Sequence, residues 1–478
     1  MVAIDDRWNH STVSGDRFPT GPHADARGRA HRRYASIVLS FTLLLTAAAC
    51  ISSPLEPAEQ DQAQNLNVAP SNVWLSVGNT QRVVAWVTGP ESGEQISYTW
   101  TTSDPDVLEI VETDSTVVLY AKKSGSVKVG VTADKPGKRI GQRADAVTVT
   151  VTDSNQEASV GRILGVPELQ NTWSGLPFSG TYDAKFTEWG DTHWSRSAGQ
   201  WEYTYYDRAL AWYAAWWRTG DARYLERAET DVLAYRDDYV LPNNGGVPPR
   251  WVFPEGLAIH YILTGDPLSG DAIALMAKRM SEVGWLDNML TTNYQDGRIQ
   301  GRAVLAQLIA AEVGAPPLRD WNAELSRGIE HLLEWYQVSG ADGSWEMNQY
   351  CGGQANFQVS HALLEVLIRY HDLVNPDPRI PDVVRKSLNY MWQWWDAGAQ
   401  AFSYNTVECA AGGTGPAVDL NMLIVFPFGW YYQVSGEDVY RQRGDDVLQA
   451  GLAKTFWSGH KQFNQSFMRS WRYPQYTN

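Results

Sequence analysis

The feature that most constrains this fold is an alternation of two kinds of helical segment over residues 160–478. Segments of one kind are apolar almost all round, and each is followed by an amphipathic segment. A helix that is apolar on every side is buried on every side, whereas an amphipathic helix covers one side of a core. The sequence therefore predicts an inner layer of helices surrounded by an outer layer. The predicted inner helices are 209–217, 257–263, 303–313, 357–368 and 420–432, and the predicted outer helices are 222–238, 270–283, 318–337, 379–395 and 437–453.

The connections between these helices are of two lengths. Short turns at 219–221, 264–266 and 435–437 place a Gly after an inner helix and an acidic residue before the outer one, a good helix stop and start. The return connections are long and rich in aromatic, polar and Gly residues: 243–255, 293–302, 343–356 and 402–419. All of them lead into the N-terminal end of an inner helix. We therefore expect them to gather on one face, where sites are commonly built.

Two stretches of this region carry a resemblance. Tyr206-Asp207-Arg208-Ala209-Leu210 leads into the first short turn, and residues 255–261 lead into the second. They resemble the (α/α) toroid of the six-hairpin glycosidase and polysaccharide lyase superfamily, over about residues 200–458. The resemblance implies a ring of helical hairpins and a carbohydrate-active domain. Five hairpins are clear, and residues 160–200 show no helical period, which leaves an open, a five-membered or a six-membered ring.

Residues 71–153 alternate with a period of two instead. Several short strand-like runs, separated by Gly, Pro, Asp and Ser, are typical of an all-β sandwich. The stretches Val77-Gly78-Asn79-Thr80, Trp100 to Val107 and Val147 to Val151 are similar to bacterial immunoglobulin-like repeats of surface proteins and adhesins. That resemblance implies a spacer module without chemistry of its own. The predicted fold class is thus an all-β sandwich followed by an all-α toroid.

The N-terminal region carries an export signal. Four Arg residues precede an apolar run, 34–49, which ends in three Ala followed by Cys50. A basic flank, a short apolar core and small residues at its end are typical of a secretory signal. The Ala-Ala-Ala-Cys box resembles a bacterial lipoprotein cleavage site, which implies a signal peptide at 1–49 and a lipidated Cys50. A plain signal peptide and a short uncleaved anchor are the alternatives. We expect a flexible tether at 50–70 and an exported protein, anchored by lipid in an outer or cell-surface membrane.

Cysteine usage agrees with export. If Cys50 carries lipid, Cys351 and Cys409 remain as a pair, and an even pair in an oxidising compartment favours a disulfide. Both cysteines lie in return loops that enter neighbouring inner helices. We therefore predict the Cys351–Cys409 disulfide.

Charge and motifs exclude several classes of function. The net charge of −15 argues against nucleic acid as a partner. The sequence has no P-loop, no Gly-rich dinucleotide turn and no His-Glu-x-x-His motif, and its histidines show no metal-ligand spacing. We expect no cofactor and no catalytic metal, although the acidic loops leave room for a structural Ca²⁺. A monomer that binds a poly- or oligosaccharide is expected.

Candidate catalytic groups are carboxylates at the N-terminal ends of inner helices, since these can reach a shared cleft. Asp207 and Glu255 begin consecutive inner helices. Glu346 follows a Trp, and an apolar wall there would raise the pKa of a proton donor. We predict Glu255 and Glu346 as the catalytic pair and Asp207 as base or orienting residue. Alternatively, Asp207 and Glu255 are structural residues whose negative charges stabilise the N-terminal ends of their helices through the helix dipole.

Aromatic and basic residues of the same loops are candidate substrate ligands. Eighteen of the 22 Trp residues lie in 160–478, and flat sugar faces pack their C–H groups on aromatic rings. The predicted substrate-binding residues are Trp251, Arg250, Trp345, His193, Trp201 and Arg302. Alternatively, the Trp side chains only pack inside the loops as hydrophobic residues and bind no substrate.

Three classes of function remain open. A glycoside hydrolase would use paired carboxylates. A polysaccharide lyase would use a Tyr or His base with a neutralising Arg or Asn, for which Tyr404, His193, Arg250 and Asn356 are candidates. A glycan-binding or surface-layer protein would need only the Trp residues. The hydrolase is the first expectation.

Overall fold

The computed structural model describes residues 65–69, 72–78, 80–88, 96–165, 173–282 and 296–477. The chain from Asn65 onwards forms one compact unit. The predicted signal peptide, Cys50 and most of the predicted tether lie outside the described residues. The end of that tether is not a linker, because Leu66 and Val68 alternate inward as part of a first strand.

The N-terminal part of this unit consists of two four-stranded sheets. One sheet is antiparallel, in the order β1 (Asn65–Ala69), β3 (Thr80–Thr88), β6 (Thr116–Ala121) and β5 (Leu108–Thr113). The other has the order β2 (Asn72–Ser76), β8 (Lys138–Thr152), β7 (Gly125–Lys135) and β4 (Ser97–Thr102), and β2 pairs with β8 in parallel.

The two sheets share one hydrophobic core. Alternation with a period of two places Val83 and Leu119 inward from one sheet and Val129 and Val149 inward from the other. Trp100 is buried with them, and its indole Nε1 donates to the Asp114 carbonyl at 3.1 Å. The predicted sandwich is therefore present as two packed sheets, whereas its relationship to immunoglobulin-like repeats stays a prediction.

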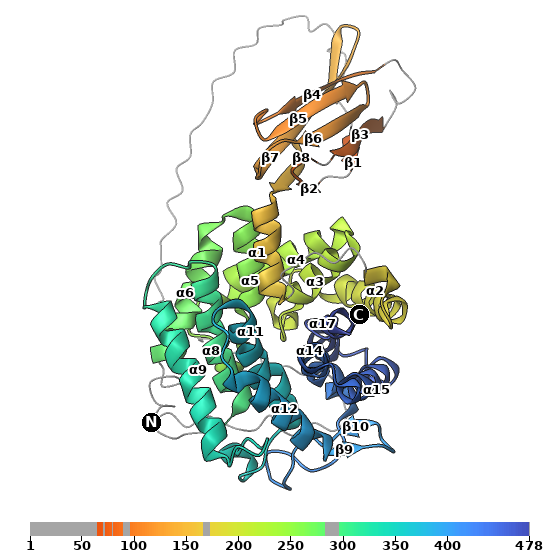
Figure 1. Cartoon of the computed structure of the whole chain (residues 1–478). Helices are drawn as coiled ribbons and strands as arrows, with labels where there is room; N and C mark the ends of the chain where they lie inside the picture. Colours follow the sequence, from red (N-terminus) through yellow and green to blue (C-terminus); the bar gives the residue numbers. More distant parts are fainter. Residues whose placement is uncertain are drawn as a thin grey trace, which may run out of the picture. The chain divides into compact units, whose positions relative to one another are not determined.

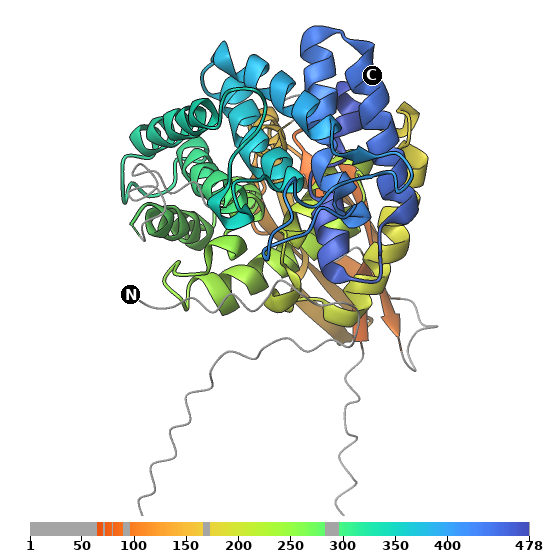
Figure 2. The ribbon, with the colours of Figure 1, turned by 90° about the horizontal axis from the view of Figure 1, so that it is seen from below.

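The rest of the chain is helical and arranged in two layers (Figures 1 and 2). The inner layer contains α3 (Arg208–Thr219), α5 (Pro254–Thr264), α8 (Gly297–Glu312), α10 (Asn356–Gln358) with the π-helical η6 (Val359–Leu364) and α11 (Glu365–Leu373), α13 (Asn421–Ile424) with α14 (Phe426–Ser435), and α16 (His460–Phe467). The outer layer contains α2 (Ser179–Ser197), α4 (Ala222–Tyr235), α6 (Pro267–Glu282), α9 (Trp321–Val338), α12 (Arg379–Trp392) and α15 (Asp438–Lys454).

Shorter elements complete the described helical part. They are α1 (Ser154–Leu164), which follows β8, α17 (Arg472–Tyr476), the strand pair β9 (Trp395–Asp396) and β10 (Ala401–Phe402), the π-helical η3 (Arg236–Val240), and the 3₁₀ turns η1 (Trp173–Gly175), η2 (Trp201–Tyr203), η4 (Pro249–Trp251), η5 (Asn348–Tyr350) and η7 (Val418–Leu420).

The layer assignment made from the sequence is confirmed. Leu257, Ile259 and Leu263 of α5 are buried, and each predicted inner helix contacts the outer helix that follows it. The short turns also have the expected geometry. Gly220 and Gly265 end inner helices in the left-handed region (φ 68° in both), which a residue with a Cβ rarely adopts.

The ring of inner helices closes through a sixth pair that the sequence analysis missed. Helix α16 contacts α3 on one side and α13 on the other, and its outer partner is α2, from the opposite end of the helical part. The yellow α2 lies beside the blue C-terminal helices in both views (Figures 1 and 2). Of the three rings left open, the six-membered one is present, and α2 is a helix although 160–200 showed no helical period. The buried stripe of α2 includes small residues, Gly190 and Ser197, which obscure its helical period.

A buried cation helps to hold this closure. The side chain of Arg218, at the end of α3, is fully buried. Its guanidinium lies 5.0 Å from the ring centroids of both Trp173 and Tyr182, and Nη2 lies 3.3 Å from Asp183 Oδ1. Cation–π contacts of this kind stabilise by about 0.5–2 kcal/mol each. They tie α3 to α2 and to the segment before it.

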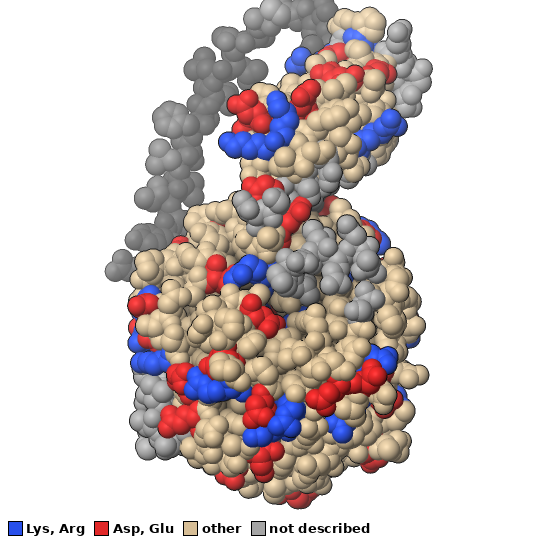
Figure 3. Space-filling view, in the orientation of Figure 1, with Lys and Arg blue, Asp and Glu red and all other residues tan. Residues whose placement is uncertain are grey.

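The face that Figure 3 shows carries no large patch of one charge. Lys and Arg are mixed with Asp and Glu over the face of Figure 3. None of the helices in the described part of the chain is long and apolar enough to span a membrane.

Candidate active site

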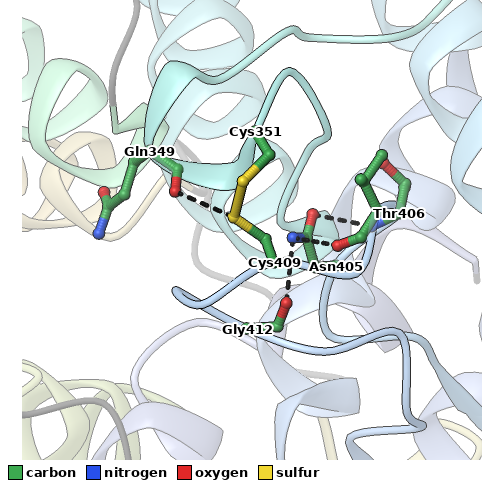
Figure 4. The surroundings of a disulfide bond; sticks show 7 residues. Gln349, Cys351, Asn405, Thr406, Cys409 and Gly412 are labelled. Carbon is green, nitrogen blue, oxygen red and sulfur yellow. Dashed lines mark hydrogen bonds between the residues drawn. A yellow bond between two sulfur atoms is a disulfide. The ribbon is translucent and has the colours of Figure 1, made fainter.

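The return loops are joined on one face by the predicted disulfide. Cys351 and Cys409 are bonded, with their Cα atoms 6.1 Å apart (Figure 4). Beside the disulfide, the Thr406 N–H donates to the Gln354 carbonyl at 3.0 Å, so the two loops also share backbone pairing. The prediction from loop position is confirmed. The disulfide fixes the loop that carries Tyr404 against the loop that enters α10.

A strained turn leads into α3 at the same face. Tyr206 and Asp207 are consecutive non-Gly residues with positive φ, 66° and 46°. Strain of this kind persists only where surrounding contacts hold it, and it clusters at functional sites. The Asp207 carboxylate supplies those contacts, since Oδ1 accepts from the Leu210 N–H and Oδ2 from the Gly256 N–H, both at 3.0 Å. A Cβ at Gly256 would lie 2.7 Å from Asp207 Oδ1, so this approach requires Gly.

Asp207 has an unusual protonation equilibrium. Burial raises the pKa of its carboxyl, and the negative charge of Glu255 raises it further, to about 7. The two backbone donors act in the opposite direction. Asp207 therefore titrates near neutral pH at the base of the strained turn.

Glu255 is held in a buried ion cluster. Its carboxylate accepts from Arg469 Nη2 at 2.6 Å through both oxygens, and from Arg369 Nη1 at 3.0 Å. The cluster continues to Glu365, which binds Arg472 at 2.8 Å. All five side chains are buried. The contacts of Glu255 are thus those of a structural carboxylate that joins α5 to α11 and to the C-terminal segment.

Arg302 and the imidazole of His361 lie near Tyr206 at the start of α3. The Arg302 guanidinium lies 4.5 Å from the Phe253 ring centroid and 5.2 Å from that of Tyr206, and Nη1 donates to the Arg250 carbonyl. The His361 ring centroid is 5.8 Å from that of Tyr206. Burial lowers the pKa of His361 well below its usual value, and nearby arginines lower it further, so the imidazole is neutral.

Two polar atoms of this centre lack a partner. His361 Nε2 and Arg298 Nε are buried and make no hydrogen bond within the described residues. A buried polar group without a partner costs about 1–3 kcal/mol. Such atoms are suited to a polar ligand that satisfies them on binding.

Tyr205 lies at the edge of this centre, half-buried. Burial acts to raise the pKa of its phenol, but neighbouring positive charges outweigh burial, and the pKa lies below the usual value. The cations responsible are Arg298, Arg302, Lys461 and Arg250. Because this phenol ionises more readily than an ordinary tyrosine, Tyr205 is suited to accept a proton.

Half-buried aromatic rings continue from Tyr205 along the rim. The Trp251 ring lies 4.7 Å from Tyr205 and 5.6 Å from Trp201, which stacks on Tyr239 at 4.0 Å between centroids. The structure therefore brings together four predicted substrate ligands: Trp201, Arg250, Trp251 and Arg302.

Three other predicted residues lie elsewhere. Trp345 is fully buried, its Nε1 donates to Ser387 Oγ of α12 at 2.9 Å, and a sugar cannot reach it. Glu346 is exposed, so the apolar wall expected around it is absent, and its pairing with the buried Glu255 stays a prediction. His193 lies on the buried stripe of α2, with Nε2 at 2.9 Å from the Trp457 carbonyl oxygen.

The residues first named for a lyase also have separate roles. The Asn356 amide is buried, donates to the Ser403 carbonyl at 3.0 Å and accepts from Gln354 at 2.9 Å, so it holds the return loops together. Tyr404 is half-buried, with its ring 5.2 Å from that of Phe357, which stacks on His361. Tyr404 therefore borders the site, and Asn356 supports it.

Several residues of the site were not found from the sequence. Arg298 lies one helical turn before the predicted Arg302 on α8, a spacing that is readable in the sequence. His361 was not singled out, because its helix is apolar, and only its unpartnered nitrogen distinguishes it. Arg469 carries no local signal, since its partner Glu255 is more than 200 residues away in the chain.

Within the residues that the structure describes, no group of three or more His, Cys, Asp or Glu side chains is placed to hold a metal ion. The site is built instead from tyrosines, arginines, one imidazole and two carboxylates.

No protein-family profile and no curated protein matches the sequence. Among solved structures, a family 76 glycoside hydrolase from a bovine Bacteroides thetaiotaomicron strain is 8% identical with a TM-score of 0.41, over 85% of this chain and 98% of that chain. A polysaccharide lyase is 12% identical with a TM-score of 0.34, over 83% and 60%. The cellobiose 2-epimerase from Spirochaeta thermophila is 12% identical with a TM-score of 0.37, over 56% and 86%.

The chain thus spans 60% of the length of the polysaccharide lyase. Identities and TM-scores at this level assign neither a family nor an activity to it.

Proposed function

We propose that this protein is a carbohydrate-active enzyme that cleaves an acidic polysaccharide by β-elimination. The observation that carries the proposal is the position of Tyr205, a half-buried phenol among four cations, next to a buried Arg298 Nε without a partner. Cations beside a phenol favour the phenolate, which is a base. The same cations can bind the carboxylate of a uronic acid, because guanidinium groups bind carboxylates well.

The reaction would proceed in one balanced sequence. The Tyr205 phenolate removes the proton at C5 of a uronate, and Arg298 and Arg302 stabilise the negative charge that spreads onto the carboxylate. The electrons form a C4=C5 double bond as the C4–O bond breaks. The leaving oxygen takes a proton, which the newly formed Tyr205 phenol can return. The products are a reducing end and an unsaturated uronate, and no water is consumed.

The rim residues would bind the rest of the chain. The half-buried Trp251 ring lies beside Tyr205, and the half-buried Trp201 ring follows it along the rim. A sugar can pack its C–H groups on such a face while its hydroxyls stay in water. A poly- or oligosaccharide is therefore the substrate class that best matches this surface.

Glycoside hydrolysis by paired carboxylates is the second candidate. It is favoured by one observation, the pKa of Asp207, which burial and then the charge of Glu255 raise to about 7, as a general acid requires. Against it, both Asp207 oxygens accept backbone N–H groups, and Glu255 is paired with two arginines. In the β-elimination proposal, Arg298 is paired with Asp296 at 3.4 Å and Arg302 donates to the Arg250 carbonyl, but Arg298 Nε has no partner among the described residues.

We also propose that the enzyme acts outside the cytoplasm, anchored through a lipidated Cys50. The basic flank and the Ala-Ala-Ala-Cys box support this proposal. The Cys351–Cys409 disulfide supports it independently, because structural disulfides are typical of oxidising compartments.

The test is a panel of uronate polymers, such as polygalacturonate, alginate and hyaluronan, with mannan as a neutral control. Ultraviolet absorbance of the C4=C5 double bond and reducing ends are followed together. We expect both to rise together with at least one uronate polymer, and the Tyr205→Phe variant to lose roughly 10²–10⁴-fold in rate. Reducing ends without absorbance would establish the hydrolase instead. Binding without either product would leave a glycan-binding protein.

A further inference from the structure

A second group of aromatic and basic side chains lies beside Tyr205. It comprises Tyr203, Phe456, His460 and Lys461. The Tyr203 and His460 rings lie 4.8 Å apart between centroids, and the charge of Lys461 acts on the Tyr205 phenol. We call these four residues the His460 group. None of them was singled out from the sequence as a substrate ligand.

The ring order places the His460 group on the other side of Tyr205 from Trp251. Helix α3 contacts α16 on one side and α5 on the other. Tyr205 lies in the loop that enters α3, Trp251 in the loop that enters α5, and His460 begins α16. Tyr205 is therefore flanked by the Trp251 loop and by the His460 group, all on the face where inner helices begin.

The His460 group is held to the Tyr205 loop by direct bonds. Asn464 of α16 is buried, and its Nδ2 donates to the carbonyls of Tyr203 at 2.8 Å and Tyr205 at 2.7 Å. The Phe456 N–H donates to Asp419 Oδ1 at 2.8 Å, which fixes the loop before α16. The position of the group relative to Tyr205 is thus set by a buried amide rather than by surface contacts alone.

Exposure of this group indicates a binding surface. Phe456 is 63% exposed, more than any other large hydrophobic residue whose exposure the structure describes. Tyr203 and His460 are half-buried, and Lys461 is exposed. The Phe456 ring lies 3.8 Å from where a Cβ on Gly459, the residue before His460, would lie. An exposed phenyl ring at the start of α16, the paired Tyr203 and His460 rings and a cation provide flat faces for sugar rings and a charge for a carboxylate.

We infer that the His460 group is a second saccharide subsite, so that an acidic polysaccharide chain crosses Tyr205 with sugar units bound on both sides and is cleaved internally. The inference rests on the proposed β-elimination at Tyr205 and adds its mode of action. Sugar units before the cleaved bond occupy one flank, and sugar units after it occupy the other. An enzyme that acts from chain ends needs a wall beside the cleaved bond, whereas here both flanks present accessible rings.

The first experiment follows the wild-type protein on the uronate polymer that yields unsaturated products. Viscosity and product size are measured together with absorbance. We expect viscosity to fall early, while most bonds are intact, with long unsaturated oligosaccharides as the first products. Unsaturated mono- or disaccharides from the outset, with viscosity falling only in proportion to absorbance, would overturn the inference and leave the proposed function standing. No unsaturated product from any uronate polymer would overturn the proposed function itself.

The second experiment uses variants of the His460 group and matched controls. Phe456→Ala and Lys461→Gln are each expected to lower kcat/KM on the polymer roughly fivefold. They should also shift the early products towards a different length, which a merely structural role would not do. Leu318→Ala and Lys185→Gln are the controls, since they remove an exposed apolar residue on the turn before α9 and a half-buried cation on the outer helix α2, neither of them in a return loop. Unchanged kcat/KM and product lengths in both His460-group variants would overturn the inference.

Discussion

Arg469 binds Glu255 with Nη2 at 2.6 Å from each carboxylate oxygen, across more than 200 residues of chain. Nη1 of the same guanidinium donates to the His361 carbonyl at 3.1 Å. One arginine from the C-terminal segment therefore connects the start of α5 with the helix that carries the unpartnered imidazole. The site is complete only when the last described helices have packed into the ring.

Replacing Arg469 by Met should therefore destabilise the whole helical part. The variant leaves the buried Glu255 with Arg369 alone, and breaking a buried ion pair costs roughly 3–5 kcal/mol. We expect a lower urea midpoint in equilibrium unfolding. Arg385→Met removes an exposed arginine paired with Asp382 on α12 and is the matched control, with a midpoint close to that of the wild type. Equal midpoints for the two variants would contradict the role given to Arg469.

Removing the disulfide should also lower stability. Cys351 and Cys409 are 58 residues apart in the chain, and closing a loop of that length stabilises by about 4 kcal/mol in the chain-entropy model. The double variant Cys351→Ser, Cys409→Ser and the reduced wild type should therefore unfold at the same, lower urea concentration. Thiol titration of the unfolded, unreduced protein is the check. Reactive thiols at both positions would show that the bond is absent.

Asp207 should make stability depend on pH. Burial and then Glu255 raise its folded pKa from 3.8 to about 7, so the folded state binds a proton that the unfolded state has released. This contribution to stability is fully present below about pH 4 and is lost as pH rises through about 7. We expect the unfolding free energy of the wild type, relative to Asp207→Asn, to decrease between these values and to level off above them.

Comparison with Asp207→Asn isolates this group from the histidines. His260 and His331 have pKa values lowered to about 4, chiefly by burial. They act with the opposite sign, since the stability that they contribute is lost as pH falls from 6.5 towards 4. Both contribute equally to wild type and variant and cancel in the difference. A constant difference across this range would show that Asp207 stays ionised when folded.

The architecture was largely predictable because it rests on local patterns. All-round apolar segments such as 257–263 can only be interior, and a Gly before an acidic residue ends one helix and begins another. The disulfide followed from the same reasoning, since both cysteines precede neighbouring inner helices. The sixth helix pair was not predictable in this way. A Cβ on Gly190 of α2 would lie 3.0 Å from the Trp212 ring, so the two helices pack closely there. Small residues that allow such close packing are not strongly hydrophobic, and the helical pattern of hydrophobic residues is therefore weak.

The site was less predictable because its residues acquire their roles from distant partners. Asp207 and Glu255 were correctly placed at the starts of inner helices, but Arg369 and Arg469, which pair with Glu255, lie more than 100 residues further along the chain. Trp345 was predicted to bind substrate because it lies in a return loop. Its side chain instead packs against α12, where it donates to Ser387. Position along the chain identified the correct face of the ring. Only tertiary contacts distinguish a residue that can bind substrate from one that is buried in the loop.

Arg298→Gln should shift the pH dependence of the reaction. If Tyr205 is the base, kcat/KM rises with pH as its phenol ionises. Burial raises the pKa of that phenol, and Arg298 is the largest of the opposing charges that bring it below the usual value. Removing this charge should move the rising limb of the pH profile to higher pH. A change that merely lowered the rate at every pH would leave the limb in place.

The same shift should be visible without substrate. In a spectroscopic titration, the difference between wild type and Tyr205→Phe isolates the ionisation of this one phenol, which should occur below the pH typical of tyrosine. In the Arg298→Gln background the difference signal should appear at higher pH, in step with the kinetic limb. Arg385→Gln, on the outer helix α12, is the control and should move neither curve. Both measurements report the ionisation of the same phenol, so Arg298 should affect them equally. If the rising limb of the pH–rate profile moves while the Tyr205 titration does not, the base is another group.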